Sequence, residues 1–261
     1  MRNMLVGTAV VAAATLLEAV RNRILMIGLL FAVVLLGLSV AAASVSFGEE
    51  SRLIIDVGLA ASSVFGAAIA ISLSIASFAG ELRRHTAYPI LARPIPRFAF
   101  VLGKYLGVVV TVVIVVAVMV AATATIVTVY DAAPPSAFWA SLVLTAVEVQ
   151  LVVAVATLFS ALTSPALAAA FSVGLVLAGN LAGDIQLFAL RLSNKGVALG
   201  YWLQGLYYLL PDLQRLSART QAANHLEVAA NELVLNAAYG LGYGVAALVL
   251  ACWLFDRRRV I

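Results

Sequence analysis

The chain has 261 residues, of which 64% are hydrophobic and only 11% are charged, and its mean hydropathy is +1.09. Soluble domains typically carry about a quarter charged residues, so this composition excludes an ordinary soluble protein and predicts a single membrane domain over residues 1–261. The net charge of +4 does not indicate nucleic-acid binding, because the arginines cluster between apolar runs, where anionic lipid and topology account for them. Cys252 is the only cysteine, which excludes an intrachain disulfide.

Residues 1–23 begin with an apolar stretch that is shorter than a membrane span and that ends in charged residues. A signal peptide is the main alternative, but the segment before the apolar stretch holds one arginine and no clear cleavage site follows it. The pattern therefore predicts an amphipathic helix at the cytoplasmic membrane surface. The residues near one face of this helix are Asn3, Gly7, Glu18 and Asn22.

Six later stretches are long and apolar enough to span a membrane, which takes roughly 20 residues of helix. The break between the fourth and fifth falls at Thr163-Ser164-Pro165, because proline disfavours helix just before it. The sequence thus predicts an all-α membrane protein with six transmembrane helices, at about 24–47, 53–80, 98–130, 136–162, 165–190 and 233–255.

The distribution of lysine and arginine predicts the orientation of these spans. With the N-terminus inside, 11 of the 16 basic residues lie on the cytoplasmic side and the remaining 5 lie outside. Because cytoplasmic loops are enriched in basic residues, we expect a multi-pass plasma (inner) membrane protein with both termini in the cytoplasm.

The cytoplasmic loop 81–97 combines charge, apolar residues and rigid turns. A basic loop that only holds two helix ends inside explains the arginines, but it explains neither the apolar residues nor the paired prolines. A short helix that docks into a groove of a protein partner explains both. The residues assigned to this segment are Glu81, Arg83, Arg84, Tyr88, Ile90, Leu91, Arg93, Pro94 and Arg97.

Three polar residues inside the spans are candidates for a translocation path, since ionisable groups in hydrocarbon are costly. Glu148 lies near the middle of the fourth span, and Asn180 and Asp184 are four residues apart, which places them on one face of a continuous fifth span. The alternative is that these side chains bond neighbouring helices. Small residues of the second span predict close helix packing: Ala60, Ser63, Gly66, Ala67 and Ala70.

The external segment 191–232 contains an apolar, aromatic-rich stretch that is too short to span. It predicts a re-entrant or interfacial piece between the fifth and sixth spans, which ends at Pro211-Asp212. Tyr207 and Tyr208 are expected to anchor it at the membrane interface.

Several motifs of enzymes are absent from the sequence. It has no GxxxxGK[ST] phosphate loop, HExxH or GxSxG motif, and the two histidines fall on opposite sides of the predicted membrane. We therefore expect no catalytic residues, no metal site and no ATP hydrolysis by this chain alone.

The order of motifs resembles that of type-2 ABC exporter permeases, including the permease of nitrous oxide reductase maturation systems. Two further segments agree, Tyr207-Tyr208-Leu209-Leu210-Pro211-Asp212-Leu213 and Phe255-Asp256-Arg257-Arg258, whereas His85 and Ala87 stand where the family has glycine and leucine. The matching positions of the cytoplasmic loop and the helix after it are Glu81, Thr86, Leu91, Arg93, Pro94, Arg97, Gly103, Lys104 and Gly107.

This resemblance implies a permease subunit that pairs with a second permease, either the same chain or a paralogue, and binds two ABC ATPase subunits. The loop 81–97, Thr86 included, would transmit ATPase closure to the spans. ATP and Mg would be bound by the ATPase, with no cofactor on this chain, and membrane lipids would surround the spans. The alternatives are a secondary transporter, for which no inverted repeat is evident, a membrane scaffold subunit, and an intramembrane enzyme.

Overall fold

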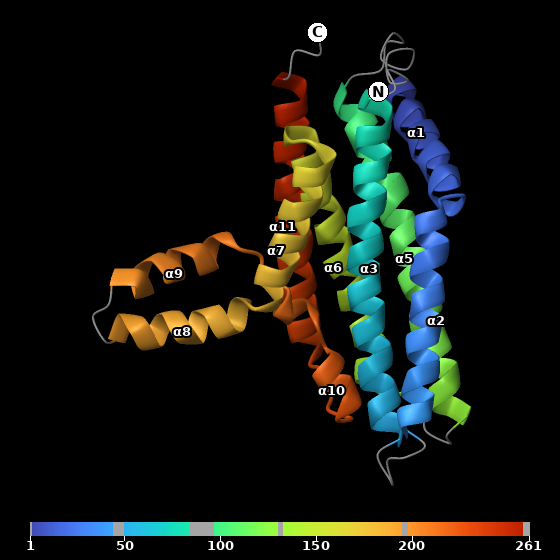
Figure 1. Ribbon diagram of the computed structural model, residues 1–261, viewed down its shortest axis with the longest axis vertical. Helices are drawn as coiled ribbons and strands as arrows, with labels where there is room; N and C mark the ends of the chain where they lie inside the picture. The colour runs from blue at the N-terminus through green and yellow to red at the C-terminus, as the bar shows by residue number, and fades with distance from the viewer. Residues whose placement is uncertain (1, 44–49, 84–96, 130–132, 195–197, 258–261) are drawn as a thin grey trace.

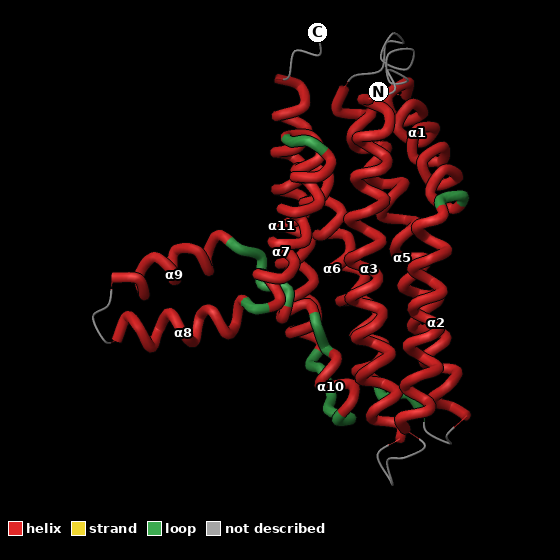
Figure 2. Tube along the Cα trace, in the orientation of Figure 1, coloured by secondary structure: helices red, strands yellow, loops and turns green. Residues whose placement is uncertain are grey.

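The computed structural model describes residues 2–43, 50–83, 97–129, 133–194 and 198–257. Throughout these ranges the chain forms helices joined by short loops, with no strand (Figure 2). The all-α prediction is therefore confirmed. Long uncharged runs favour helices because a helix bonds its own backbone groups within the segment, as hydrocarbon requires.

Most helices match the predicted spans closely. α2 (Arg23–Ala43), α3 (Glu50–Arg83), α5 (Arg97–Val129), α6 (Ser136–Leu162) and α11 (Ala230–Arg257) correspond to the first four and the sixth. Within the described ranges four helices, α3, α5, α6 and α11, have the length and hydropathy of a span, and a bent pair of helices makes a fifth only if the pair counts as one span. The protein is thus a multi-pass membrane protein, and the count of six spans stays a prediction.

α3 lies at the centre of the bundle and packs against α2, α5, α6 and α7 (Pro165–Asn180) (Figure 1). α1 begins and α11 ends at one end of the bundle, and α3 also ends and α5 also begins there (Figure 1). Both described termini, the end of α3 and the start of α5 therefore lie on the same side of the bundle, as the predicted topology requires.

The predicted continuous fifth span is wrong. α7 ends at Asn180, and α8 (Ala182–Asn194) continues at an angle of 65°. Leu181 between them has φ −101° and ψ 6°, outside the helical region. Gly179 allows this break: the Leu213 N–H donates to its carbonyl at 3.1 Å, and a Cβ at Gly179 would meet the Pro211 carbonyl oxygen at 2.7 Å.

α8 and α9 (Ala198–Leu209) form a helical hairpin that projects away from the bundle (Figure 1). Its outward-facing apolar residues include Leu187, Phe188, Tyr201, Trp202 and Tyr208. The apolar stretch predicted as re-entrant or interfacial is therefore one arm of a hairpin whose other arm is the C-terminal part of the predicted fifth span. Its interfacial position stays a prediction.

α1 (Arg2–Val20) packs lengthwise on α5 (Figure 1), and its place at the membrane surface stays a prediction. Val11 and Thr15 face Gly103 and Gly107, which have no side chains to hold the helices apart. Lys104, only 3% exposed, reaches Glu18 at 3.5 Å. Gly103, Lys104 and Gly107, which the family resemblance singled out, thus belong to the surface of α5 on which α1 packs.

We predict that Gly107→Val destabilises the protein. A Cβ at Gly107 would lie 2.7 Å from the Ala12 carbonyl oxygen and 2.6 Å from the Thr15 Cβ, so α1 would have to shift. Overpacking of this kind costs about 1–3 kcal/mol, seen as a lower thermal unfolding midpoint in detergent. Gly242→Val is the control, because a Cβ there meets nothing within 4 Å. Equal midpoints for the two variants would contradict this packing.

A second prediction concerns the two ends of the bundle. In a Cys252→Ala background, an impermeant thiol reagent should label His85→Cys only from the cytoplasmic side and Glu227→Cys only from the other side. Glu227 is exposed between α10 (Arg219–Ala223) and α11. α10 lies at the end of the bundle opposite to the one where α3 ends and α5 begins (Figure 1). Labelling of both cysteines from one side would overturn the topology.

Candidate functional site

A groove with two adjoining cavities runs along the helices α3, α6 and α7. One cavity, of about 350 Å³, is lined by these three helices alone. The other, of about 440 Å³, is lined by α3, α6, the segment 214–221 and Asn180 at the end of α7. Ser63, Val64 and Asn180 line both, so the two cavities are neighbours and form one candidate site.

Glu148 of α6 lies at the inner wall of the smaller cavity and is only 2% exposed. Both of its carboxylate oxygens accept hydrogen bonds from the Ser63 Oγ of α3, at 2.9 and 3.0 Å. Within the part of the chain that the structure describes, no lysine, arginine or histidine pairs with it. A carboxylate with one hydroxyl partner and no cation is an expensive group to bury.

The structure brings together two of the three predicted path residues. Asn180, at the C-terminal end of α7, lines both cavities. Its Nδ2 donates to the Val176 carbonyl at 2.9 Å, and its own carbonyl accepts a bond from the Gln214 Nε2 at 2.6 Å. Asp184 is exposed in the first turn of α8 and lines neither cavity. The prediction that it shares a face with Asn180 is wrong, because the chain bends between them.

Sequence reasoning missed the partner of Glu148. Ser63 was assigned to close packing with the other small residues of the second span. That role holds for Gly66, where a Cβ would meet the Val116 and Val149 methyl groups at 2.9 and 3.0 Å. Ala60 and Ala67 line the cavities together with Ser63. A serine 85 positions before the glutamate gives no local signal of contact.

Most of the predicted coupling segment lies outside the described residues. Glu81 and Arg83 belong to the last turn of α3, and Arg97 is the first residue of α5. The remaining assigned residues fall in 84–96 and stay predictions: Arg84, Thr86, Tyr88, Ile90, Leu91, Arg93 and Pro94.

Comparison with known families decides the assignment. The family model described as "ABC-2 family transporter protein" matches residues 9–260, nearly the whole chain. The chain belongs to the ABC-2 family of transporter proteins. No curated protein matches its sequence. The match supports the predicted resemblance to type-2 ABC permeases, while the likeness to the permease of nitrous oxide reductase maturation systems stays a prediction.

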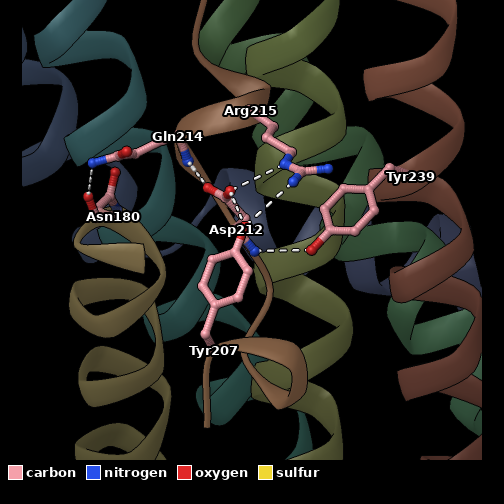
Figure 3. Close-up of polar contacts among 6 residues, drawn as sticks. All are labelled: Asn180, Tyr207, Asp212, Gln214, Arg215 and Tyr239. Atoms are coloured by element: carbon pink, nitrogen blue, oxygen red, sulfur yellow. Dashed lines mark hydrogen bonds and ion pairs between the residues drawn. The ribbon is translucent and has the colours of Figure 1, made fainter. Parts of the chain in front are cut away.

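In this ABC-2 family member, a polar cluster around Asp212 holds part of the external segment 191–232 against the bundle (Figure 3). The Asp212 side chain accepts bonds from Arg215 Nε at 3.1 Å, the Gln214 backbone N–H at 3.1 Å and the Tyr207 hydroxyl at 3.5 Å. Its own backbone N–H donates to the Tyr239 hydroxyl of α11 at 2.9 Å. The hydrogen bond with Tyr207 raises the pKa of Arg215, so its guanidinium stays charged.

Three of the four residues predicted for the external segment meet here. Tyr207 and Asp212 are both 8% exposed and bond each other, and Pro211 touches the end of α7. Tyr208 is 81% exposed, and its ring lies edge-on to that of Tyr207, with centroids 5.6 Å apart. An ion pair holds the same segment at a second place, because Arg219 of α10 lies 3.1 Å from the Asp56 carboxylate of α3. The segment is therefore fixed to α3, α7 and α11 at the mouth of the larger cavity.

We predict that Asp212→Ala loosens this segment. The change removes the acceptor of three hydrogen bonds and leaves Arg215 without its carboxylate, at a cost of about 1–3 kcal/mol. The thermal unfolding midpoint should fall, and the segment 211–223 should be cut faster by protease. Asp184→Ala, which removes an exposed carboxylate on α8, is the control. Equal stability and equal cleavage of the two variants would contradict the anchoring role.

Proposed function

We propose that this chain is the transmembrane permease subunit of an ABC exporter, which moves its substrate with ATP hydrolysed by a separate ATPase subunit. The observation that supports it is the groove along α3, α6 and α7, with a buried carboxylate at its wall, in a member of the ABC-2 family. Groups of this kind inside a membrane protein mark substrate pathways by default.

The central helix α3 gives the groove a direct mechanical link to the coupling segment. Ser63 bonds Glu148 at the groove, and the same helix runs on to Arg83, where the coupling segment follows. Twenty residues of helix cover about 30 Å. If an ATPase holds the segment differently in its two nucleotide states, α3 shifts with it and changes the contact between Ser63 and Glu148. Such a differential contact is what coupling requires.

The complete transporter would contain two ABC ATPase subunits, which bind ATP and Mg, and a second permease, either the same chain or a paralogue, within the plasma membrane. An apolar surface on α7 supports the second permease. Leu167, Phe171 and Leu177 are all about half exposed or more on the helix that forms one wall of the groove. A partner on this surface would close the groove into a path shared by two subunits.

The decisive experiment removes the apolar residues of the coupling segment. Tyr88 and Leu91 would each contribute roughly 1.5–3 kcal/mol if buried in an ATPase groove. Tyr88→Ser with Leu91→Ser should therefore release the ATPase during purification, or uncouple its hydrolysis from transport, while membrane insertion stays normal. The measurements are the amount of ATPase bound per chain and its rate of ATP hydrolysis in proteoliposomes.

The matched control makes the same chemical change at Tyr208 and Leu226, which are exposed in the external segment. This pair should keep the ATPase and its hydrolysis. A secondary transporter or a scaffold subunit would show no dependence on a bound ATPase. If the double variant in the coupling segment retains full ATPase binding, hydrolysis and transport, the proposed function is wrong.

A further inference from the structure

We propose that the cavity between α3, α6 and α7 binds hydrophobic organic cations, with the Glu148 carboxylate as their counter-ion. This deepens the proposed function by naming the class of substrate. Binding itself needs only this chain, so it is measurable without an ATPase.

The walls of this cavity are mostly apolar and contain a single ionisable residue. Glu148 is the only ionisable residue among those that line it. Ser63 and Asn180 are the other polar ones. The apolar lining comes from α3 and α7: Val64, Ala67, Ala68, Ile71, Val173, Val176 and Leu177. A ligand that fills this space must bury an apolar body and place its charge beside a carboxylate.

The carboxylate has capacity for a cation. Ionised carboxylates offer about four acceptor sites, and the Ser63 Oγ supplies the one side-chain donor seen at Glu148, whose burial leaves 2% of the residue exposed. None of the described lysines, arginines or histidines compensates its charge through an ion pair. A cation in the cavity would supply that missing compensation, because a buried charge is stabilised by a close opposite charge.

The surroundings favour cations over anions. No basic residue lines this cavity. Arg219 lines the adjoining one, but its guanidinium lies 3.1 Å from the Asp56 carboxylate, which offsets its charge. The groove therefore offers an entering cation one carboxylate, that of Glu148, and offers an anion no basic side chain that lacks an acidic partner among the residues that line the two cavities.

The cavity does not suit a metal ion. Calcium takes six to eight oxygen ligands and magnesium an octahedral set, whereas this cavity offers one carboxylate, one hydroxyl and one amide. Among the described residues there is no group of three histidine, cysteine, aspartate or glutamate side chains that could hold a metal. The volume of about 350 Å³ lies within the range of small-molecule sites, about 300–1,000 Å³. An organic cation matches both the carboxylate of Glu148 and the volume of the cavity.

Two ions of nearly equal size and opposite charge test this directly. Tetraphenylphosphonium is the cationic probe and tetraphenylborate the anionic one. Each is titrated into lipid nanodiscs that hold the full-length chain, with binding to empty nanodiscs subtracted. We expect the chain to add saturable binding of the phosphonium only. Glu148→Gln keeps the shape of the side chain and should weaken this binding about tenfold or more, whereas Asp184→Asn should leave it unchanged.

A second variant leaves the carboxylate untouched. Val173→Phe narrows the cavity and should weaken phosphonium binding at an unchanged thermal unfolding midpoint. If Glu148→Gln fails to fold, the comparison of the two probes on the unmodified chain still tests the charge selectivity. Equal binding of both probes, or full affinity in a folded Glu148→Gln protein, would overturn the proposal. Retention of an ATPase by a chain that binds no phosphonium would refute only this inference. Binding that depends on Glu148 in a chain that couples to no ATPase would refute only the exporter assignment.

Discussion

The carboxylate of Glu148, buried between α3 and α6, constrains how these two helices pack. An unpaired carboxylate in an apolar interior costs far more than a neutral polar group, and here one serine hydroxyl offsets part of that cost at 2.9 and 3.0 Å. The contact fixes α6 against α3, since either helix sliding by one turn would separate the two side chains by about 5.4 Å. The cavity at the same place keeps the remaining acceptor sites open to a ligand. Helix packing and the proposed binding site therefore depend on the same pair of residues.

The break at Leu181 determines where the groove ends. Had the fifth span continued straight, α7 and α8 would form one wall along the whole groove. Instead α8 turns by 65°, and the chain returns through α9 to the Asp212 cluster, which lies against the end of α7 and against α11 (Figure 3). The segment 214–221 then replaces α8 as the wall of the larger cavity. Polar contacts hold this segment through Asp212, Gln214 and Arg219.

Periodicity and length were enough to predict the long helices but not how they meet. Ser136–Leu162 agrees with prediction at both ends, because Pro165 and the polar turn before it mark the boundary locally. The bend at Leu181 depends on Gly179 accepting the backbone of residues 211–213, a contact between distant segments. The same holds for the pair of Ser63 and Glu148. The glycines on which α1 packs belong to α5, so the residues of α1 alone carry no signal of this contact. Glu148 and Asn180 were predictable as costly polar groups in apolar runs, whereas their partners were not.

The position of the groove along α3 bears on how an ATPase would act on it. α3 contacts α2, α5, α6, α7 and α10, so a movement at the end of α3 that precedes the coupling segment has to be shared among all of these helices. Packed interiors do not deform continuously, and helices therefore shift as rigid bodies between discrete arrangements. The weakest restraint on such a shift is the wall that α3 shares with α7, because a cavity in place of side chains lies between them. A change at the coupling segment would accordingly appear first as a change in the width of the site at Glu148, before the contacts of α3 with α5 or α2 are disturbed.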